Sequence, residues 1–339
     1  MIVAIEDNKA IFNTAILFLV FNRPSNTAIV FEQIRKIAPS RLYVAADGPR
    51  HGKEGEAELT TNVRKIATAV DWSCKVTTLF REENMGCRAA VGDAITWFFS
   101  MEQEGIILED DCLPSESFFW FCQAMLSKYR TEEKIGSIRG THLSMHDGAS
   151  SYYFSRHALP WGWASWARAW NKSDRQMTSW PQATPIRHLK SLNVGGWLFS
   201  LHFAGILKKV ARREIDSWSN PWMYNCWCYE LLTVCPPRNL IRNIGFSDEA
   251  TNTITDHPVL SNLKANELEW PVQGTPSLTP NDSADAFILK CWFGIGVASF
   301  LKSLAVKIFG LQAMKSLKKS VLYCEKLVFR RINSRDNAR

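Results

Sequence analysis

Three consecutive acidic residues are the strongest candidates for chemistry in this sequence. Glu109, Asp110 and Asp111 follow an apolar run at 106–108 and precede Pro114. A short, continuous apolar run is typical of a strand buried on both faces, and such a strand would carry the three carboxylates to a surface. Like charges repel unless a cation lies among them, and carboxylates suit Mg²⁺ or Mn²⁺, which could in turn hold a diphosphate. The alternative is a solvated acidic turn that caps the next helix.

The elements that position this triplet follow from the alternation of apolar runs with helical patterns. We expect strands at 15–21, 41–46, 75–80 and 106–108, separated by helices at about 25–37, 54–70 and up to 101. Further along we expect a helix at 115–130 and short strands at 135–138 and 239–244. Strands that alternate with helices predict an α/β fold with a parallel sheet, whose carboxyl edge is where ligands bind.

Polar residues follow each of the first four predicted strands. They are Asn22, Arg23, Asp47, the segment 81–84 with Asn84, and the acidic triplet. Because the carboxyl ends of parallel strands share one edge, we expect these side chains to converge on one cleft. The sequence contains neither GxGxxG after the first strand nor GxxxxGK[ST], so a diphosphate would need another counterion. A cation on the triplet would supply it.

Aromatic residues are concentrated in the second half of the chain. Residues 161–227 hold nine of the 14 tryptophans. These rings could be core residues or platforms for sugar rings, with Trp163 and Trp218 as candidates for acceptor binding. Asp216 lies beside this aromatic run, where apolar surroundings would raise its proton affinity and suit a general base. The alternative for Asp216 is a helix-end or ion-paired acid.

Composition limits the classes of protein. An apolar fraction of 46% excludes a disordered or fibrous chain, and no secretory signal is recognisable at the start, so we expect a cytoplasmic protein. The nine cysteines form no CxxC pair, which favours reduced thiols over disulfides or a zinc site. Residues 1–289 hold 29 basic and 31 acidic side chains, so nucleic acid is not an expected ligand of the main domain.

The basic character of the chain is concentrated at its C-terminal end. Residues 290–339 hold 11 Lys and Arg against two acids. The apolar run at 291–301 is too short to cross a bilayer, which needs about 20 residues, so we expect an amphipathic helical tail on an anionic membrane surface. A helix packed on the body is the alternative. Residues 257–289, rich in Pro, Asn, Ser and Asp, indicate a linker.

The order of several motifs resembles a known group of enzymes. FNRP at 21–24, ADGPR at 46–50, NMGC at 84–87, EDDCLP at 109–114 and DSW at 216–218 occur in this order, with LPWGWASWARAW at 159–170. Together they resemble bacterial nucleotide-sugar glycosyltransferases of the GT-A fold, a family 2-like group similar to N-acetylglucosaminyltransferase I. The resemblance covers about residues 14–256. Asn252 departs from it, because relatives have a His near that position.

The resemblance implies roles for individual residues. Asp111 would bind Mn²⁺ or Mg²⁺, Glu109 and Asp110 would contact the donor, and Arg23, Asp47 and Asn84 would hold the nucleotide. Asp216 would deprotonate an acceptor hydroxyl. The implied activity is inverting transfer of a hexosyl or N-acetylhexosaminyl group, with UDP-sugar as the expected donor. The acceptor would be a glycan or a lipid-linked glycan in cell-surface polysaccharide synthesis, such as lipopolysaccharide, at the inner face of the membrane.

The predicted organisation divides the chain into four parts. Residues 14–140 would form the nucleotide-sugar-binding half and 141–256 the Trp-rich catalytic half of one domain, followed by the linker-like 257–289 and the tail 290–339. Two other readings of the function stay open at this point. One is a metal-dependent glycosidase or nuclease that uses the acidic triplet directly. The other is a carbohydrate-binding or membrane scaffold protein without turnover.

Overall fold

The computed structural model describes residues 11–143, 152–246, 260–272 and 277–296 of the 339-residue chain. The chain separates into two compact units, Met1–Trp292 and Phe293–Arg339. All helices and strands of the described residues belong to the first unit. The predicted role of the tail, its extent beyond residue 296, and the loop position Asn252 lie outside the described residues.

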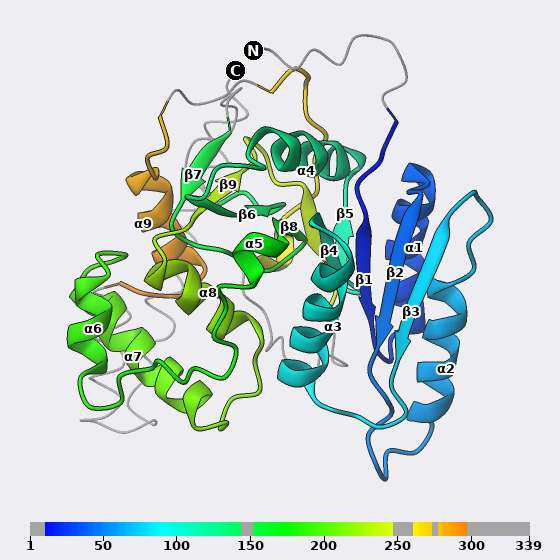
Figure 1. Cartoon of the computed structure of the whole chain (residues 1–339), viewed down its shortest axis with the longest axis horizontal. Coiled ribbons are helices and arrows are strands. Elements are labelled where there is room, and N and C mark those ends of the chain that lie inside the picture. The colour runs from blue at the N-terminus through cyan, green and yellow to red at the C-terminus, as the bar shows by residue number, and fades with distance from the viewer. Residues whose placement is uncertain (1–10, 144–151, 247–259, 273–276, 297–339) are drawn as a thin grey trace, which may run out of the picture. The chain divides into compact units, whose positions relative to one another are not determined.

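A sheet of eight strands runs through the first unit in the order β3-β2-β1-β4-β8-β6-β9-β7 (Figure 1). Its N-terminal strands are β1 (Ile16–Val20), β2 (Arg41–Ala46), β3 (Lys75–Phe80) and β4 (Glu104–Glu109). Its other strands are β6 (Ile135–Arg139), β7 (Tyr153–Ser155), β8 (Trp163–Trp166) and β9 (Leu232–Cys235). The first four are parallel, whereas β8 runs antiparallel to β4 and β6. The predicted α/β class is confirmed, and the sheet is mixed but mostly parallel.

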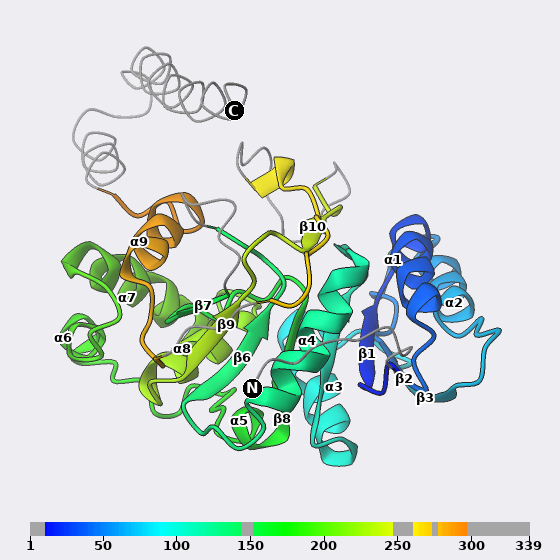
Figure 2. The ribbon, with the colours of Figure 1, turned by 90° about the horizontal axis from the view of Figure 1, so that it is seen from above.

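Helices cover both faces of the N-terminal part of the sheet (Figure 2). On one face, α1 (Pro24–Ile37), α2 (Glu56–Ala67) and α4 (Glu116–Lys128) share a buried cluster with the sheet. The sheet contributes Phe18, Val44 and Leu108 to this cluster. On the other face, α3 (Cys87–Met101) places Phe98 against Tyr43, with ring centroids 5.0 Å apart. This two-sided burial explains why β1, β2 and β4 contain continuous apolar runs, whereas the edge strand β3 has no buried residue.

The second half of the chain extends the same sheet and adds further helices. These are α5 (Ala167–Trp170), α6 (Pro185–Ser191), α7 (Trp197–Ala211), α8 (Ser219–Cys228), the 3₁₀ turn η1 (Leu260–Asn262) and α9 (Asp282–Cys291). A separate two-stranded ribbon pairs β5 (Cys112–Pro114) with β10 (Ile241–Asn243). Because β5 begins directly after Asp111, this ribbon fixes the chain on the C-terminal side of the acidic triplet.

The segment predicted as a linker, 257–289, belongs to the first unit and contacts its helices and strands where it is described. Glu267 accepts hydrogen bonds from the N–H groups of Glu116 (3.2 Å) and Ser117 (2.8 Å), and so caps the start of α4. Asp285 on α9 is buried and accepts a hydrogen bond from Ser155 Oγ at 2.6 Å. In the described parts of the chain, no helix is long and apolar enough to cross a membrane.

Candidate functional site

A cleft of about 610 Å³ opens at the carboxyl ends of the parallel strands. It lies where the strand order changes direction, between β1 and β4, which is the usual ligand site of open α/β sheets. Its walls come from segments that are distant in the sequence. The charged and aromatic residues that line it are Phe21, Arg23, Asp47, Arg50, Arg81, Glu109, Asp110, Asp111, Trp161, Asp216 and Trp218.

The acidic triplet lies at the floor of this cleft, beside Arg23. Glu109 is the last residue of β4 and is level with Leu19 of β1. Asp111 accepts a hydrogen bond from the Arg23 guanidinium at 3.1 Å, and Asp110 lies 3.9 Å from the same nitrogen. Asp110 also accepts a hydrogen bond from the N–H of Phe21 at 3.3 Å. The ends of β1 and β4 are therefore joined through their polar residues.

The environment of the triplet disfavours three negative charges. Burial, reinforced by the negative charge of Asp111, raises the pKa of Asp110 to about 7. Burial, together with the charges of both neighbours, also raises the pKa of Glu109 well above its usual value. Arg23 opposes both shifts without cancelling them. A further cation at this place would relieve the repulsion.

The triplet fits a hard cation that is shared with a ligand. Among the described residues, no three His, Cys, Asp or Glu side chains form a complete protein site for a metal ion. Glu109 lines the cleft, however, and its carboxylate accepts no hydrogen bond from any described residue. Mg²⁺ and similar ions are often held by one or two carboxylates together with substrate phosphates. The available oxygen donors match that arrangement.

Asp47 and Asn84 organise the loop between β3 and α3. The Asp47 carboxylate accepts hydrogen bonds from the N–H groups of Gly48 (2.9 Å), Met85 (3.0 Å) and Gly86 (3.2 Å). The Asn84 amide donates to Asp47 Oδ2 and to the Gly48 carbonyl, each at 2.9 Å. Burial raises the pKa of Asp47 in spite of these bonds. Both residues line the cleft, but their polar atoms are largely used within the protein.

Asp216 lines the cleft and caps the N-terminus of α3. Its two carboxylate oxygens accept hydrogen bonds from the N–H groups of Cys87 (2.8 Å) and Arg88 (2.9 Å). The helix-end role considered for this acid therefore describes its position in this structure. Asp216 is also exposed to the cleft, so its remaining lone pairs can meet a ligand. The base role predicted from the resemblance is untested by this geometry.

Of the two tryptophans that were predicted to bind an acceptor, Trp218 lines the cleft and Trp163 does not. Trp218 lines the cleft, whereas Trp163 lies in β8 with 1% of its surface exposed and is outside the cleft. The two rings stack with centroids 5.7 Å apart, so Trp163 supports Trp218 from behind. Trp161 lines the cleft instead and is partly exposed, although no sequence signal distinguished it from its neighbours.

Two arginines in the cleft were not assigned a role from the sequence. Arg81 directly follows β3, and its guanidinium has no hydrogen-bond partner among the described residues. Arg50 also lines the cleft and is paired with the buried Glu56 at 2.5 Å. The position of Arg81 immediately after a parallel strand was the available signal. With Arg23, the cleft contains three guanidinium groups and five carboxylates.

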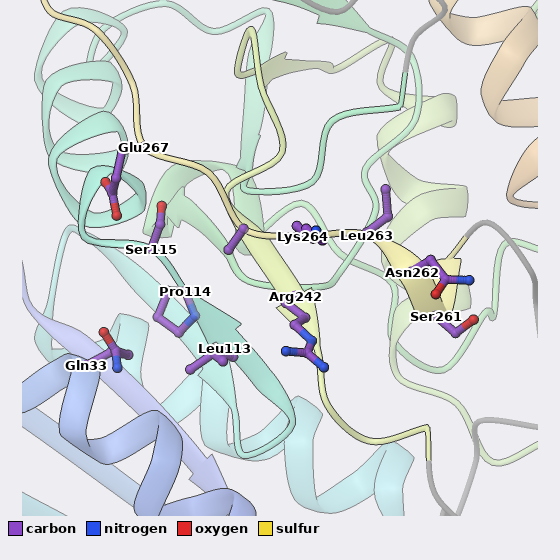
Figure 3. Close-up of a pocket in the computed structure, with 11 residues that line it drawn as sticks. Gln33, Leu113, Pro114, Ser115, Arg242, Ser261, Asn262, Leu263, Lys264 and Glu267 are labelled. Carbon is purple, nitrogen blue, oxygen red and sulfur yellow. The ribbon is translucent and has the colours of Figure 1, made fainter. Parts of the chain in front are cut away.

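A second cavity, of about 510 Å³, lies beside the β5–β10 ribbon (Figure 3). Arg242 and Lys264 line it together with several neutral residues. Its one acidic residue is Glu267, whose carboxylate already caps α4. This cavity lacks a group of carboxylates, and none of the candidate site residues predicted from the sequence lines it.

Comparison with known proteins gives only distant similarities. The sequence matches no model of a known protein family and no curated protein. A mannosyltransferase from Pyrobaculum calidifontis, solved with GDP-Man and Mn²⁺, is 12% identical, with a TM-score of 0.31 over 63% of this chain and 74% of its own. Mouse xyloside xylosyltransferase 1 is 9% identical, with a TM-score of 0.30 over 65% and 83%. A UDP-glucose pyrophosphorylase is 10% identical, with a TM-score of 0.24 over 44% of this chain and 64% of its own. Similarities this low do not identify an activity.

Proposed function

We propose that this protein is a metal-dependent glycosyltransferase that moves a sugar from a nucleotide-diphosphate donor to a hydroxyl of a glycan or lipid-linked acceptor. The observation that carries the proposal is the gathering of three guanidinium groups and five carboxylates in one cleft at the switch point of the sheet. Guanidinium groups bind phosphates, and carboxylates bind cations and sugar hydroxyls. The motif order that resembles GT-A glycosyltransferases supports the same activity.

The donor would lie across the ends of β1 to β4. Arg81 is the guanidinium best able to contact phosphate, because it donates no hydrogen bond to a described residue. Arg23 would contact the nucleotide beside the triplet, and Glu109 and Asp110 would accept hydrogen bonds from donor hydroxyls. Asp47 and Asn84 would act by holding the loop 84–86 in place, since their polar atoms already bind that loop.

Asp111 is the proposed metal ligand, with its carboxylate beside Arg23. A divalent cation bound there would stabilise, as a Lewis acid, the charge that develops on the departing diphosphate. Arg23 would share this task, because its guanidinium can turn from Asp111 toward a phosphate oxygen. Burial and mutual repulsion raise the pKa of the neighbouring acids, and a cation at this place would favour their charged forms, which supports the assignment.

Asp216 is the proposed general base. It would take the proton of the attacking hydroxyl from the wall opposite the triplet, and the sugar would be transferred in a single displacement with inversion. The α3 amides would hold the carboxylate in one orientation during this step. Trp218 and Trp161 would provide apolar surface for the acceptor sugar.

We expect the donor to be a UDP-linked hexose or N-acetylhexosamine. Cell-surface polysaccharide synthesis, such as that of lipopolysaccharide, is the expected process, on the cytoplasmic side of a membrane that the basic tail would contact.

A screen of nucleotide sugars tests this proposal. Purified protein is incubated with UDP- and GDP-sugars in the presence of Mn²⁺, and release of the nucleoside diphosphate is measured with and without glycan acceptors. We expect release with one donor class and its loss in Asp111→Ala. Glycan binding without nucleotide release from any donor would contradict transfer and favour a binding protein. Glycan cleavage without a nucleotide would favour a glycosidase.

A further inference from the structure

A local excess of positive charge lies in the first unit, away from the cleft floor. Residues 175–213 contain seven basic residues and no acidic residue. The near balance of charge over residues 1–289 conceals this excess. The basic residues are Arg175, Arg187, Lys190, Lys208, Lys209, Arg212 and Arg213. The segment includes α6 and α7, which pack together at the end of the unit opposite α1 and α2 (Figures 1 and 2).

Helix α7 has a buried face and an exposed face. Phe199, Phe203, Leu207 and Val210 are buried and face the body of the unit. With 3.6 residues per turn, the opposite side of the helix carries Trp197, Leu201, Lys208, Lys209 and, one residue past its end, Arg212. We refer to these five residues as the α7 face. Trp197 is 54% exposed, and the three basic residues are exposed as well.

The charges of the α7 face are not neutralised within the described structure. Lys208 and Lys209 have no carboxylate partner among the described residues. Arg212 approaches Glu214 only at 4.0 Å, and both side chains are about half exposed. Exposed pairs of this kind contribute little energy. Nearby on α6, Arg187 and Lys190 are exposed and also lack a carboxylate partner within the described ranges.

We propose that the α7 face docks on an anionic membrane surface. A helix that combines exposed Lys and Arg with an exposed Trp is typical of helices that lie at a lipid interface. The basic side chains would contact anionic head groups, and Trp197 would enter the interfacial layer, where its ring is favoured. A purely electrostatic partner such as nucleic acid would not use the exposed apolar surface of Trp197.

The location of the α7 face gives this docking a consequence. Arg212 precedes Asp216 by four residues, and Asp216 lines the cleft. A membrane on the α7 face would therefore lie beside the acceptor side of the cleft, where a lipid-linked substrate could enter. Docking through the α7 face depends on the charges and the exposed Trp197 of that face. It requires neither the proposed activity nor the basic tail.

Vesicle co-sedimentation tests the proposal with the full chain. The probes are vesicles of phosphatidylcholine alone and vesicles with added phosphatidylglycerol. Lys208→Ala combined with Lys209→Ala should weaken binding to the anionic vesicles about 30-fold, and should reduce its salt dependence. Trp197→Ala should also weaken binding but leave the salt dependence unchanged. The control Lys36→Ala with Lys65→Ala removes two exposed lysines from α1 and α2, and should change binding less than about twofold.

Each outcome decides the proposal. Melting temperatures equal to that of the wild type exclude misfolding of the variants, because all altered side chains are exposed. If the wild type ignores anionic vesicles, or if the α7 variants bind as well as the wild type, the proposal is wrong. If an RNA homopolymer binds with the same dependence on Lys208 and Lys209 while vesicles do not, the partner is nucleic acid and the proposal is also overturned.

Discussion

Asp216 must satisfy two requirements at the scale of a single residue. Its carboxylate caps α3 through Cys87 and Arg88, and it is also the proposed base for the acceptor hydroxyl. A cap orients the carboxylate, whereas a base must also present a free lone pair to the substrate. The exposure of Asp216 to the cleft permits both roles. Substitution can separate the two contributions because one affects stability and the other affects rate.

The first residue-scale prediction concerns Asp216→Asn. The amide leaves one α3 N–H without an acceptor, which should cost about 1 kcal/mol of unfolding free energy. Loss of the base should lower the transfer rate about 10²- to 10⁴-fold. The matched control is Glu267→Gln, which removes the corresponding cap of α4 outside the cleft. In urea denaturation Glu267→Gln should lose a similar unfolding free energy, and its transfer rate should be normal. A normal rate in Asp216→Asn would refute the base assignment.

His157 gives a second residue-scale prediction, on pH. It is fully buried, and burial lowers its pKa to about 4. Between about pH 6.5 and pH 4 the unfolded chain therefore binds a proton at His157 that the folded protein does not bind. The free energy of unfolding consequently has its full value above about pH 6.5 and decreases as the pH falls. Between pH 7 and pH 5 this residue should account for about 2 kcal/mol of lost stability.

Urea denaturation of the wild type and of His157→Gln at the two pH values measures this contribution. The difference between the two proteins isolates His157 from the carboxylates that titrate in the same range. If both proteins lose the same free energy of unfolding between pH 7 and pH 5, His157 is protonated or exposed in the folded state, which would contradict this prediction.

At the scale of elements, the β5–β10 ribbon fixes the position of Asp111. The N–H of Ile244 donates a hydrogen bond to the Asp111 carbonyl at 2.8 Å, and Cys112 pairs with Asn243. Gly245, which follows, lies against the Asp111 side chain, because a Cβ atom there would be 2.5 Å from Asp111 Oδ2. The carboxylate is therefore held between Arg23 and the chain after β10.

Gly245→Ala tests this positioning without changing a charge. The added methyl group should displace the Asp111 carboxylate and weaken metal-dependent nucleotide binding by about tenfold, equivalent to about 1.4 kcal/mol. The control is Gly205→Ala on α7, where a Cβ atom would meet open space. It should leave binding unchanged and stabilise the helix by about 0.5–1 kcal/mol. Calorimetric titration of both variants checks these values, and unchanged binding in Gly245→Ala would contradict the positioning role.

The bounds of some strands could be predicted from the sequence, whereas other strands could not. β2 and β3 have the predicted bounds. For β2 the reason is its apolar run bounded by turn residues, which is typical of a buried strand. β3 contains no buried residue, and its bounds follow from its β-branched residues and the turn residues around it. β8 was not predicted, since Trp163–Trp166 has neither alternation nor a typical β-branched composition, and the tryptophans of this run were interpreted as either core residues or platforms for sugar rings. The capping of α3 by Asp216 joins residues 128 positions apart, which no local pattern reveals.

At the scale of the whole molecule, the topology brings the candidate residues together. β1 and β4 are neighbours although three helices and two strands separate them in sequence, and the cleft opens at their carboxyl ends. Parallel-strand logic predicted this convergence for Arg23, Asp47, Asn84 and the triplet. The same reasoning could not predict that Asp216 and Trp218 also line the cleft. The chain reaches them after β8, which runs antiparallel to β4 and β6.

The central claim is that a divalent cation at Asp111 holds the two phosphates of a nucleotide. Calorimetric titration of UDP and GDP into the wild type and Asp111→Asn, with Mn²⁺ and with EDTA, tests it most directly. We expect Mn²⁺ to strengthen nucleotide binding to the wild type by about tenfold or more, and to have no such effect on the variant. Without metal the variant should bind at least as well as the wild type, because Arg23 is released from its ion pair. Equal affinity of the wild type in Mn²⁺ and in EDTA would contradict the claim.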